Sequence, residues 1–182
     1  MQAGIAETVG RASRALGLAD GPIHAECRLT PDGRIYVLEV AARPIGGLCS
    51  RVLTFEAADA EAEKGPSLEA ILLRHAIGED VATAVRESRG AAVMMIPIAR
   101  RGILKGVAGE EAARAVTGVT DVRITAKLGQ LLEPLPEAGS YLGFIFARDT
   151  AAGSAVAAVR AAHQRLAFDV ARELPVTTDK TE

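Results

Sequence analysis

Two glutamates flank a turn signal at a spacing that can bring their carboxylates together. Glu26 and Glu39 lie in two runs of strand-forming residues, 23–29 and 35–41, with Asp-Gly at 32–33 between them. Asp-Gly between alternating runs is a strong hairpin signal and favours a two-residue type I′ turn. That turn places the two glutamates directly opposite each other on one face, with Cβ atoms about 5 Å apart.

A pair of opposed carboxylates needs a compensating group, because like charges in this position destabilise a sheet. A hard divalent cation such as Mg²⁺ or Mn²⁺ fits this need, since it binds one or two carboxylates together with phosphate oxygens. A guanidinium just beyond the strand could meet a phosphate or an oxyanion. The register predicts further residues on this face or next to it: His24, Arg28, Val37, Ala41 and Arg43.

A plainer structural interpretation stays open for these residues. The hairpin could face solvent, with the glutamates paired to Arg28 or Arg34. His24 either orients substrate or phosphate, or is a hydrogen-bonded structural histidine. His75 and His163 fall within apolar patterns of helical spacing, so we expect them to pack rather than to bind a ligand.

Composition excludes several other classes of function. The chain has 182 residues, of which 49% are hydrophobic, and a net charge of −2 without a basic patch, so nucleic acid is not an expected partner. It shows neither a signal peptide nor an apolar run of membrane-spanning length, which predicts a cytoplasmic protein without membrane contact. Cys27 and Cys49 match no metal or redox spacing and predict two buried, reduced thiols.

The pattern along the chain predicts an α+β protein with a domain boundary near residue 90. The first part, 1–89, contains the hairpin and two helices, the second of which begins after an N-cap at Ser67. The second part, 90–175, is mostly strands and turns, and a polar tail follows at 176–182. We expect helices at 6–18, 68–75, 110–116 and 150–170, and strands at 23–29, 35–41, 91–99, 103–107, 119–126 and 141–147.

Two stretches of the hairpin resemble a known family. Gly-Pro-Ile-His-Ala-Glu at 21–26 and Tyr-Val-Leu-Glu-Val-Ala-Ala-Arg-Pro-Ile-Gly-Gly at 36–47 resemble the last strands of the ATP-grasp domain, closest to carboxylate–amine ligases of the L-amino-acid ligase type. Residues 94–102, 124–127 and 140–148 resemble the C-terminal domain of those ligases. The resemblance implies the C-terminal remnant of an antiparallel ATP-grasp sheet with helices, followed by a small α+β domain.

The resemblance also implies roles for the residues of the hairpin. Glu26 and Glu39 would hold Mg²⁺ or Mn²⁺ that bridges the phosphates of ATP, and His24 and Arg43 would contact the bound groups. In the family, ATP phosphorylates a carboxylate, an amine attacks the acyl phosphate, and Arg43 matches the arginine that stabilises this chemistry. Ala41 stands where the commoner pattern has a metal-binding Asn, so the number of metal ions stays open, as does the identity of the carboxylate and the amine.

The family also has an N-terminal lobe for the carboxylate and an ATP-covering flap, which would precede residue 6. We therefore expect a C-terminal fragment or subunit of an ADP-forming carbon–nitrogen ligase that is inactive alone. Whether the chain is itself an enzyme stays open. The alternative is a non-catalytic interaction module or one half of a split ATP-grasp complex, with the missing lobe or a second copy as its partner.

Overall fold

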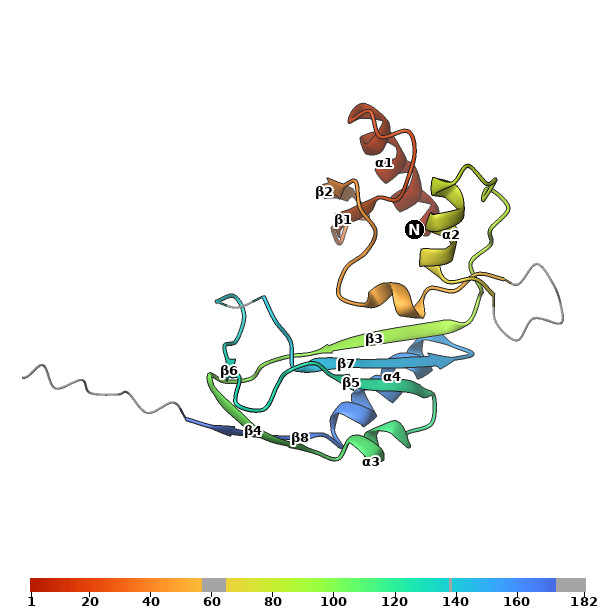
Figure 1. The fold of residues 1–182 in the computed structure, drawn as a ribbon. Helices are drawn as coiled ribbons and strands as arrows, with labels where there is room; N and C mark the ends of the chain where they lie inside the picture. The colour runs from red at the N-terminus through yellow and green to blue at the C-terminus, as the bar shows by residue number, and fades with distance from the viewer. Residues whose placement is uncertain (57–64, 138, 173–182) are drawn as a thin grey trace, which may run out of the picture. The chain divides into compact units, whose positions relative to one another are not determined.

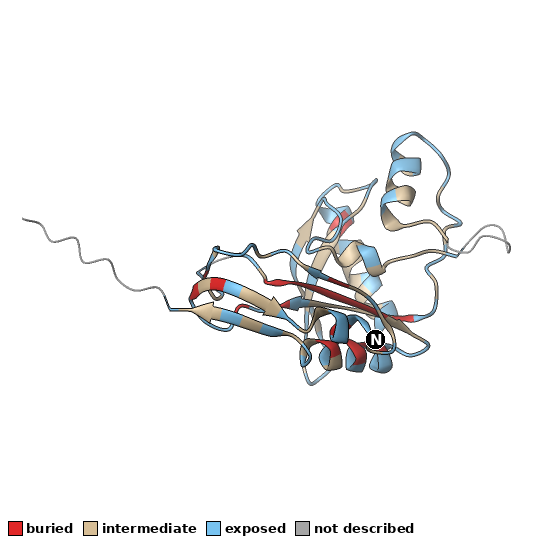
Figure 2. Cartoon of the chain, turned by 60° about the horizontal axis from the view of Figure 1, so that its bottom comes forward, coloured by how far each residue is buried: buried red, intermediate tan, exposed pale blue. Residues whose placement is uncertain are grey.

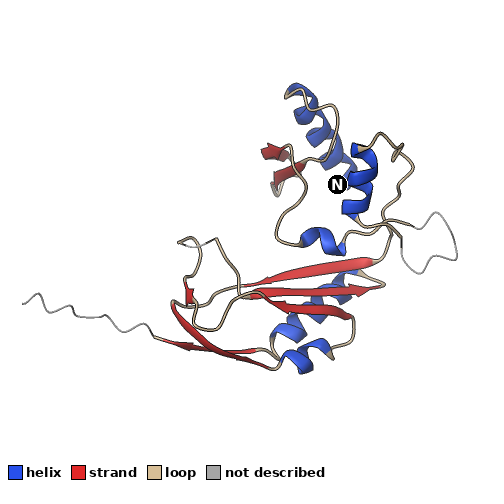
Figure 3. Cartoon of the chain, viewed as in Figure 1, coloured by secondary structure: helices blue, strands red, loops and turns tan. Residues whose placement is uncertain are grey.

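The computed structural model describes residues 1–56, 65–137 and 139–172, which form two compact units, Met1–Glu87 and Ser88–Glu182. Helices and antiparallel sheets are mixed along the chain, so the predicted α+β class is confirmed (Figure 3). The predicted polar tail at 176–182 and most of an acidic, Ala-rich stretch at 57–66 lie outside the described residues.

The first unit consists of a helix, a hairpin, a short 3₁₀ helix and a second helix (Figure 1). The first helix begins earlier than predicted and ends before Gly17, whose φ of 74° suits a residue without a Cβ. The second helix begins as predicted, because the Ser67 hydroxyl accepts a hydrogen bond from the Ala70 amide at 3.2 Å. The elements are α1 (Gln2–Ala15), β1 (His24–Leu29), β2 (Ile35–Ala41), η1 (Cys49–Val52) and α2 (Leu68–Ala76).

The second unit has two three-stranded antiparallel sheets with the strand orders β3-β7-β5 and β6-β4-β8. Helix α4 packs on β3 and β7, and α3 packs on β5. The elements are β3 (Gly90–Ile96), β4 (Gly102–Ala108), α3 (Glu110–Arg114), β5 (Val119–Ile124), β6 (Leu131–Leu132), β7 (Gly143–Asp149), α4 (Ala152–His163) and β8 (Ala167–Ala171).

The hydrophobic core lies in the second unit. Its largest fully buried side chains are Ile96, Leu104, Leu132, Ile145 and Val122, and small residues of α4 pack against them. Figure 2 shows the buried residues along the central strands and on α4. Since apolar burial is the main favourable term in folding, this core accounts for most of the stability that the second unit has.

The predicted helix over 150–170 is wrong in its last third, because α4 ends at His163 and the chain continues as β8. Apolar residues at helical spacing extend to Leu166, but the next residues alternate, with Phe168 and Val170 half-buried against the core. β8 pairs with β4, more than fifty residues earlier, and a local pattern does not contain that partner. β6 is absent from the predicted strands, because a strand of two residues has no recognisable period.

Two further sequence predictions concern the environment of the chain. Within the described residues, no helix combines the length and the apolar character that crossing a bilayer requires. Cys27 and Cys49 are free thiols, but they are half-buried rather than buried as predicted. Burial raises the pKa of the Cys49 thiol, which favours its protonated form.

Candidate functional site

The turn that joins β1 to β2 is one residue longer than the sequence predicts. The Thr30 amide donates to the Arg34 carbonyl at 3.0 Å, and the Gly33 amide donates to the Thr30 carbonyl at 2.9 Å. Gly33 has a φ of 83°, the left-handed region that a residue without a Cβ adopts most readily. The predicted two-residue turn is therefore wrong, and residues 31–33 form a three-residue loop.

A β-bulge in β2 offsets this difference in the turn. Next to the loop, Arg28 pairs with Tyr36 and Cys27 with Val37, one step away from the predicted register. The register then shifts so that Leu38 has no partner of its own, and Glu26 pairs with Glu39. Val37, predicted on the carboxylate face, is thus replaced there by Tyr36, whereas the two glutamates lie opposite each other.

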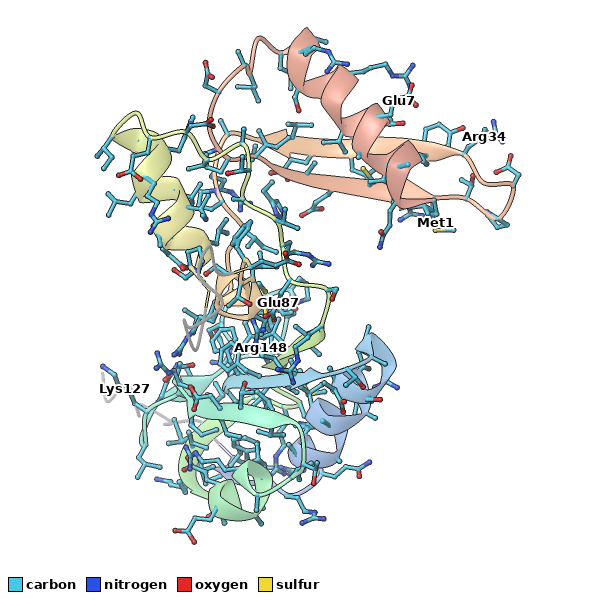
Figure 4. All side chains as sticks on the ribbon, turned by 90° about the vertical axis from the view of Figure 1, so that its right-hand side faces the viewer. Met1, Glu7, Arg34, Glu87, Lys127 and Arg148 are labelled. Atoms are coloured by element: carbon cyan, nitrogen blue, oxygen red, sulfur yellow. The ribbon has the colours of Figure 1, made fainter. Side chains whose placement is uncertain are left out.

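The two faces of the hairpin differ in what covers them. Helix α1 packs on the hairpin through β2 (Figure 4). The alternate residues Cys27, Val37 and Val40 are half-buried. Glu26 and Glu39 are on the opposite face, with side chains that are 55% and 52% exposed. Directly paired strand residues have Cβ atoms about 4.5–5.5 Å apart, so one ion can contact both carboxylates.

Each glutamate has a basic neighbour on its own strand or just after it. His24 Nε2 lies 3.5 Å from Glu26 Oε1, and Arg43 Nη2 lies 3.9 Å from Glu39 Oε1. Arg43 Nη1 also donates to the Pro44 carbonyl at 3.2 Å, which holds the guanidinium beside the end of β2. The structure therefore brings together the four residues to which the resemblance assigns roles: Glu26, Glu39, His24 and Arg43.

Arg34, one of the two arginines of the plainer interpretation, has its partner at the tip of the hairpin. Arg34 Nε is 2.6 Å from Asp32 Oδ2 at the tip of the hairpin, and Thr30 donates to the same carboxylate. These contacts, the Thr30 hydrogen bond first, hold the pKa of Asp32 below its usual value. Asp32, not a glutamate, is the partner that the structure gives to Arg34.

The donor set fits a hard cation that takes most of its ligands from elsewhere. Two carboxylates on an exposed face supply oxygen ligands and negative charge. Within the described residues, no group of three or more His, Cys, Asp or Glu side chains converges on one point. Ala41, opposite His24, adds no side-chain ligand. Such a pair matches Mg²⁺ or Mn²⁺ bound together with phosphate oxygens better than an all-protein metal site.

A hollow that the sequence did not predict adjoins this face within the first unit. Its volume is about 510 Å³, which is within the usual range of small-molecule sites. The walls come from the start of β1, the loop after β2 and one side of α2, so a local pattern could not reveal it. His75, predicted to pack in a helix, faces this hollow. The lining residues are Gly21, Pro22, Ile23, His24, Ala25, Pro44, Ile45, Leu53, Leu68, Ile71, Leu72, His75 and Val81.

Two family models match separate parts of the chain. The ATP-grasp domain matches residues 1–52, which include the whole hairpin and Arg43. The L-amino acid ligase C-terminal domain 2 matches residues 94–171, from β3 to the end of β8. No curated protein matches the chain significantly.

Solved structures share the fold of the chain. An L-amino acid ligase from Bacillus licheniformis is 26% identical with a TM-score of 0.76, over 94% of this chain and 41% of that one. Two other enzymes share the fold: a phosphoribosylglycinamide synthetase from Anaerococcus prevotii (14% identity, TM-score 0.66, 90% of this chain and 40% of that one) and an N5-carboxyaminoimidazole ribonucleotide synthetase from Thermotoga maritima (18%, 0.65, 91% and 41%). The chain thus spans about two fifths of the length of each protein that it matches.

Proposed function

The chain belongs to the ATP-grasp ligases, and we propose that it supplies the metal-binding face of an enzyme that joins a carboxylate to an amine with ATP as co-substrate. In this proposal, residues 1–89 are the C-terminal part of the ATP-grasp domain and residues 90–175 the C-terminal domain of the ligase, in a cytoplasmic enzyme. The observation that carries the proposal is the pairing of Glu26 with Glu39 on an exposed face.

The proposed roles follow from charge and position. Glu26 and Glu39 hold one or two Mg²⁺ ions, which when bound neutralise the phosphates of ATP and polarise them for transfer. Arg43, beside Glu39, presents a guanidinium to the acyl phosphate and to the oxyanion that forms when the amine attacks. His24, beside Glu26, contacts the phosphate or the substrate at the other end of the same face.

In the proposed reaction, bonds form and break only between ATP and the two substrates, and none of these side chains forms a covalent bond. The carboxylate of one substrate takes the terminal phosphoryl group of ATP and releases ADP. The amine of the other substrate then displaces phosphate from the acyl phosphate and forms the amide. The chain's residues contribute charge and orientation, which is the main form of catalysis in phosphoryl transfer.

The test is binding of Mn²⁺ and ADP to the 182-residue chain, measured by paramagnetic broadening of its NMR signals. We expect broadening centred on the hairpin and about 30-fold weaker Mn²⁺ binding in Glu39→Gln, because one carboxylate contributes roughly 2 kcal/mol toward a divalent ion about 4 Å away in water. Glu79→Gln is the matched control, since Glu79 lies in an exposed ion pair of similar length, 3.8 Å, with Arg74. Equal Mn²⁺ affinity of the two variants would falsify the metal role.

The same preparation tests the expectation that this chain alone does not turn over. Both carboxylates are about half exposed, so the bound phosphates would remain open to water and to screening. We expect no ADP release from ATP with any pair of amino acids. Sustained ADP formation that Glu39→Gln abolishes would contradict this expectation.

A second candidate function, an interaction module or one half of a split complex, is favoured by the exposed apolar side chains of the first unit. Leu73 of α2 and Ile77, its C-cap residue four positions later, are 65% and 68% exposed, and an exposed apolar face of a helix is a surface that a partner can cover. The partner would be a second copy of the chain or the lobe that completes the ATP site. Sedimentation analysis tests this candidate: a dimer at micromolar concentration supports it, and a well-behaved monomer counts against it.

A further inference from the structure

We propose that Glu69, in the first turn of α2, is a positioning residue: it anchors η1 and thereby holds the loop 42–48, which carries Arg43 beside Glu39. The inference rests on the proposed function, which assigns Arg43 to the acyl phosphate. Glu69 acts through Ser50 of η1 and does not touch the substrate. All of these residues belong to the first unit.

The loop 42–48 has little support of its own. Residues 42–47 are all exposed. In the described part of the chain, the hydrogen bonds of Arg43 are local. Its amide donates to the Ala41 carbonyl at 2.9 Å, and its Nη1 donates to the Pro44 carbonyl at 3.2 Å. Because Pro44 also lines the hollow, part of the loop borders open space rather than packed side chains. The position of the loop therefore depends on the elements at its two ends, β2 and η1.

The end of the loop that joins η1 has a strained backbone. Leu48, the N-cap of η1, has a φ of 54° and a ψ of 13°, and among the described residues it is the one non-glycine residue with a positive φ. A residue with a Cβ populates this left-handed conformation less than the right-handed one by a factor of about 5–30. Such a residue persists where its surroundings hold it. A contact that fixes η1 is therefore needed to offset the strain at Leu48.

The contact that fixes η1 comes from α2. η1 packs on α2, and the Ser50 hydroxyl of η1 donates a hydrogen bond to the Glu69 carboxylate. This hydrogen bond is the main reason why the pKa of Glu69 lies below its usual value, and the Ser67 hydroxyl and the charge of Arg51 lower the pKa further. The charged form of Glu69 is thus the form that holds η1, and hydrogen bonds to a charged group are stronger than neutral ones.

The chain after η1 continues along the start of α2. Thr54 forms an isolated β-bridge with Ser67, and the Phe55 amide donates to the Pro66 carbonyl at 3.1 Å. These backbone contacts keep η1 close to α2, but they begin only after the 3₁₀ helix has ended. The link from Ser50 to Glu69 is made within η1, two residues from the strained Leu48.

The experiment compares Ser50→Ala, which removes the hydroxyl, with Ser50→Thr, which keeps it, by NMR of the metal-free 182-residue chain. The Cys49 amide donates to the Gly46 carbonyl at 3.1 Å and the Leu53 amide to the Ser50 carbonyl at 2.8 Å, so their hydrogen exchange measures the opening of η1. We expect both amides to exchange about fivefold faster in Ser50→Ala, the effect of one hydrogen bond, and within about twofold of the parent in Ser50→Thr. The Ile71 amide of α2 is the internal control and should not change.

The side-chain Nε–H signal of Arg43 tests whether the anchor acts on the proposed site. We expect this signal to shift in Ser50→Ala and in Glu69→Ala, and to return to its parent position in Ser50→Thr. Glu79→Ala is the matched control for Glu69→Ala, because Glu79 is an exposed carboxylate beyond the other end of α2, 3.8 Å from Arg74. It should leave the Arg43 signal unchanged. Glu69→Ala acts from α2, so the test stands even if Ser50→Ala fails to fold.

Unchanged exchange of the Cys49 and Leu53 amides in both Ser50→Ala and Glu69→Ala would overturn the inference. Faster exchange with an unmoved Arg43 signal would overturn it too, because the anchor would then be structural only. The same holds if Glu79→Ala shifts the Arg43 signal as far as Glu69→Ala does. These signals are measured without metal, so they are independent of the test of the proposed function: a Glu39→Gln variant that binds Mn²⁺ as the parent does counts against the metal role alone.

Discussion

Replacing Glu26 by lysine should strengthen the metal-free hairpin and at the same time abolish the proposed binding of divalent cations. In the parent chain Glu26 is paired directly with Glu39, an arrangement in which like charges repel. Lysine at position 26 turns this repulsion into attraction. A gain in hairpin stability together with a loss of cation binding would distinguish a metal-binding carboxylate pair from an ordinary pair of surface glutamates.

The magnitude follows from the exposure of the two side chains. A direct cross-strand charge pair contributes about 0.2–1 kcal/mol, and side chains that are 55% and 52% exposed belong in the lower half of that range. Removing the repulsion with Glu26→Gln should thus stabilise the hairpin by about 0.5 kcal/mol, and Glu26→Lys by about 1 kcal/mol. The lost contact with His24 at 3.5 Å is partly exposed and offsets only a fraction of this gain.

Amide hydrogen exchange of the hairpin measures the change where it occurs. The Thr30 amide, bonded to the Arg34 carbonyl, should exchange about fivefold more slowly in Glu26→Lys than in the parent. The difference should shrink between roughly 0.01 M and 1 M salt, because the Debye length falls from about 30 Å to about 3 Å. Faster exchange in Glu26→Lys, or a difference that salt does not change, would refute the reasoning that the two carboxylates repel each other.

Two other predictions concern the backbone of the second unit and the tip of the hairpin. Gly109→Ala should destabilise the chain by on the order of 3 kcal/mol in urea unfolding, because Gly109 has a φ of 84° and an added Cβ would overlap the Arg165 carbonyl. Gly153→Ala in α4, with no atom within 4 Å of the new Cβ, should instead stabilise it by about 0.5–1 kcal/mol, and a neutral Gly109→Ala would contradict the backbone assignment. Asp32 has its pKa lowered by the Thr30 hydrogen bond, so its contribution to hairpin stability is present above pH 3.8 and is lost as the pH falls through the lower folded pKa. Hydrogen exchange against pH should show this loss in the parent and not in Asp32→Asn.

The sequence predicted correctly that the two glutamates lie opposite each other, although it predicted neither the length of the loop nor the bulge. The Asp-Gly signal indicated the right turn region, but the preference for a two-residue turn is only statistical, and the Thr30–Arg34 hydrogen bond closes a three-residue loop. The bulge at Leu38 then moves the register by one residue and brings Glu39 opposite Glu26. Neither the longer loop nor the bulge is indicated by a local sequence pattern. Each shifts the register by one residue, and the two shifts cancel at Glu26 and Glu39.

Outside the turn and the bulge of the hairpin, predictions succeeded where the cause is local and failed where it is distant. The N-cap at Ser67 depends on residues within one turn of α2, and it is found as predicted. β8 depends on pairing with β4, and the hollow on separate segments between Gly21 and Val81 that meet only in the fold. A single sequence contains the alternation of β8 but not the partner strand that makes it stable.

The position of the hydrophobic core bears on how the carboxylate pair could work. All hydrophobic side chains that the structure describes as buried belong to the second unit, and in the described part of the first unit Ser13 is the buried residue. The hairpin is therefore held by half-buried contacts with α1 and has little apolar burial to resist local opening. Under these conditions a ligand that binds the closed hairpin also stabilises it, by about 2.7 kcal/mol at a hundredfold excess over its Kd. Repulsion between Glu26 and Glu39 acts in the opposite direction, so the proposed binding of a cation between them would remove this repulsion and stabilise the hairpin.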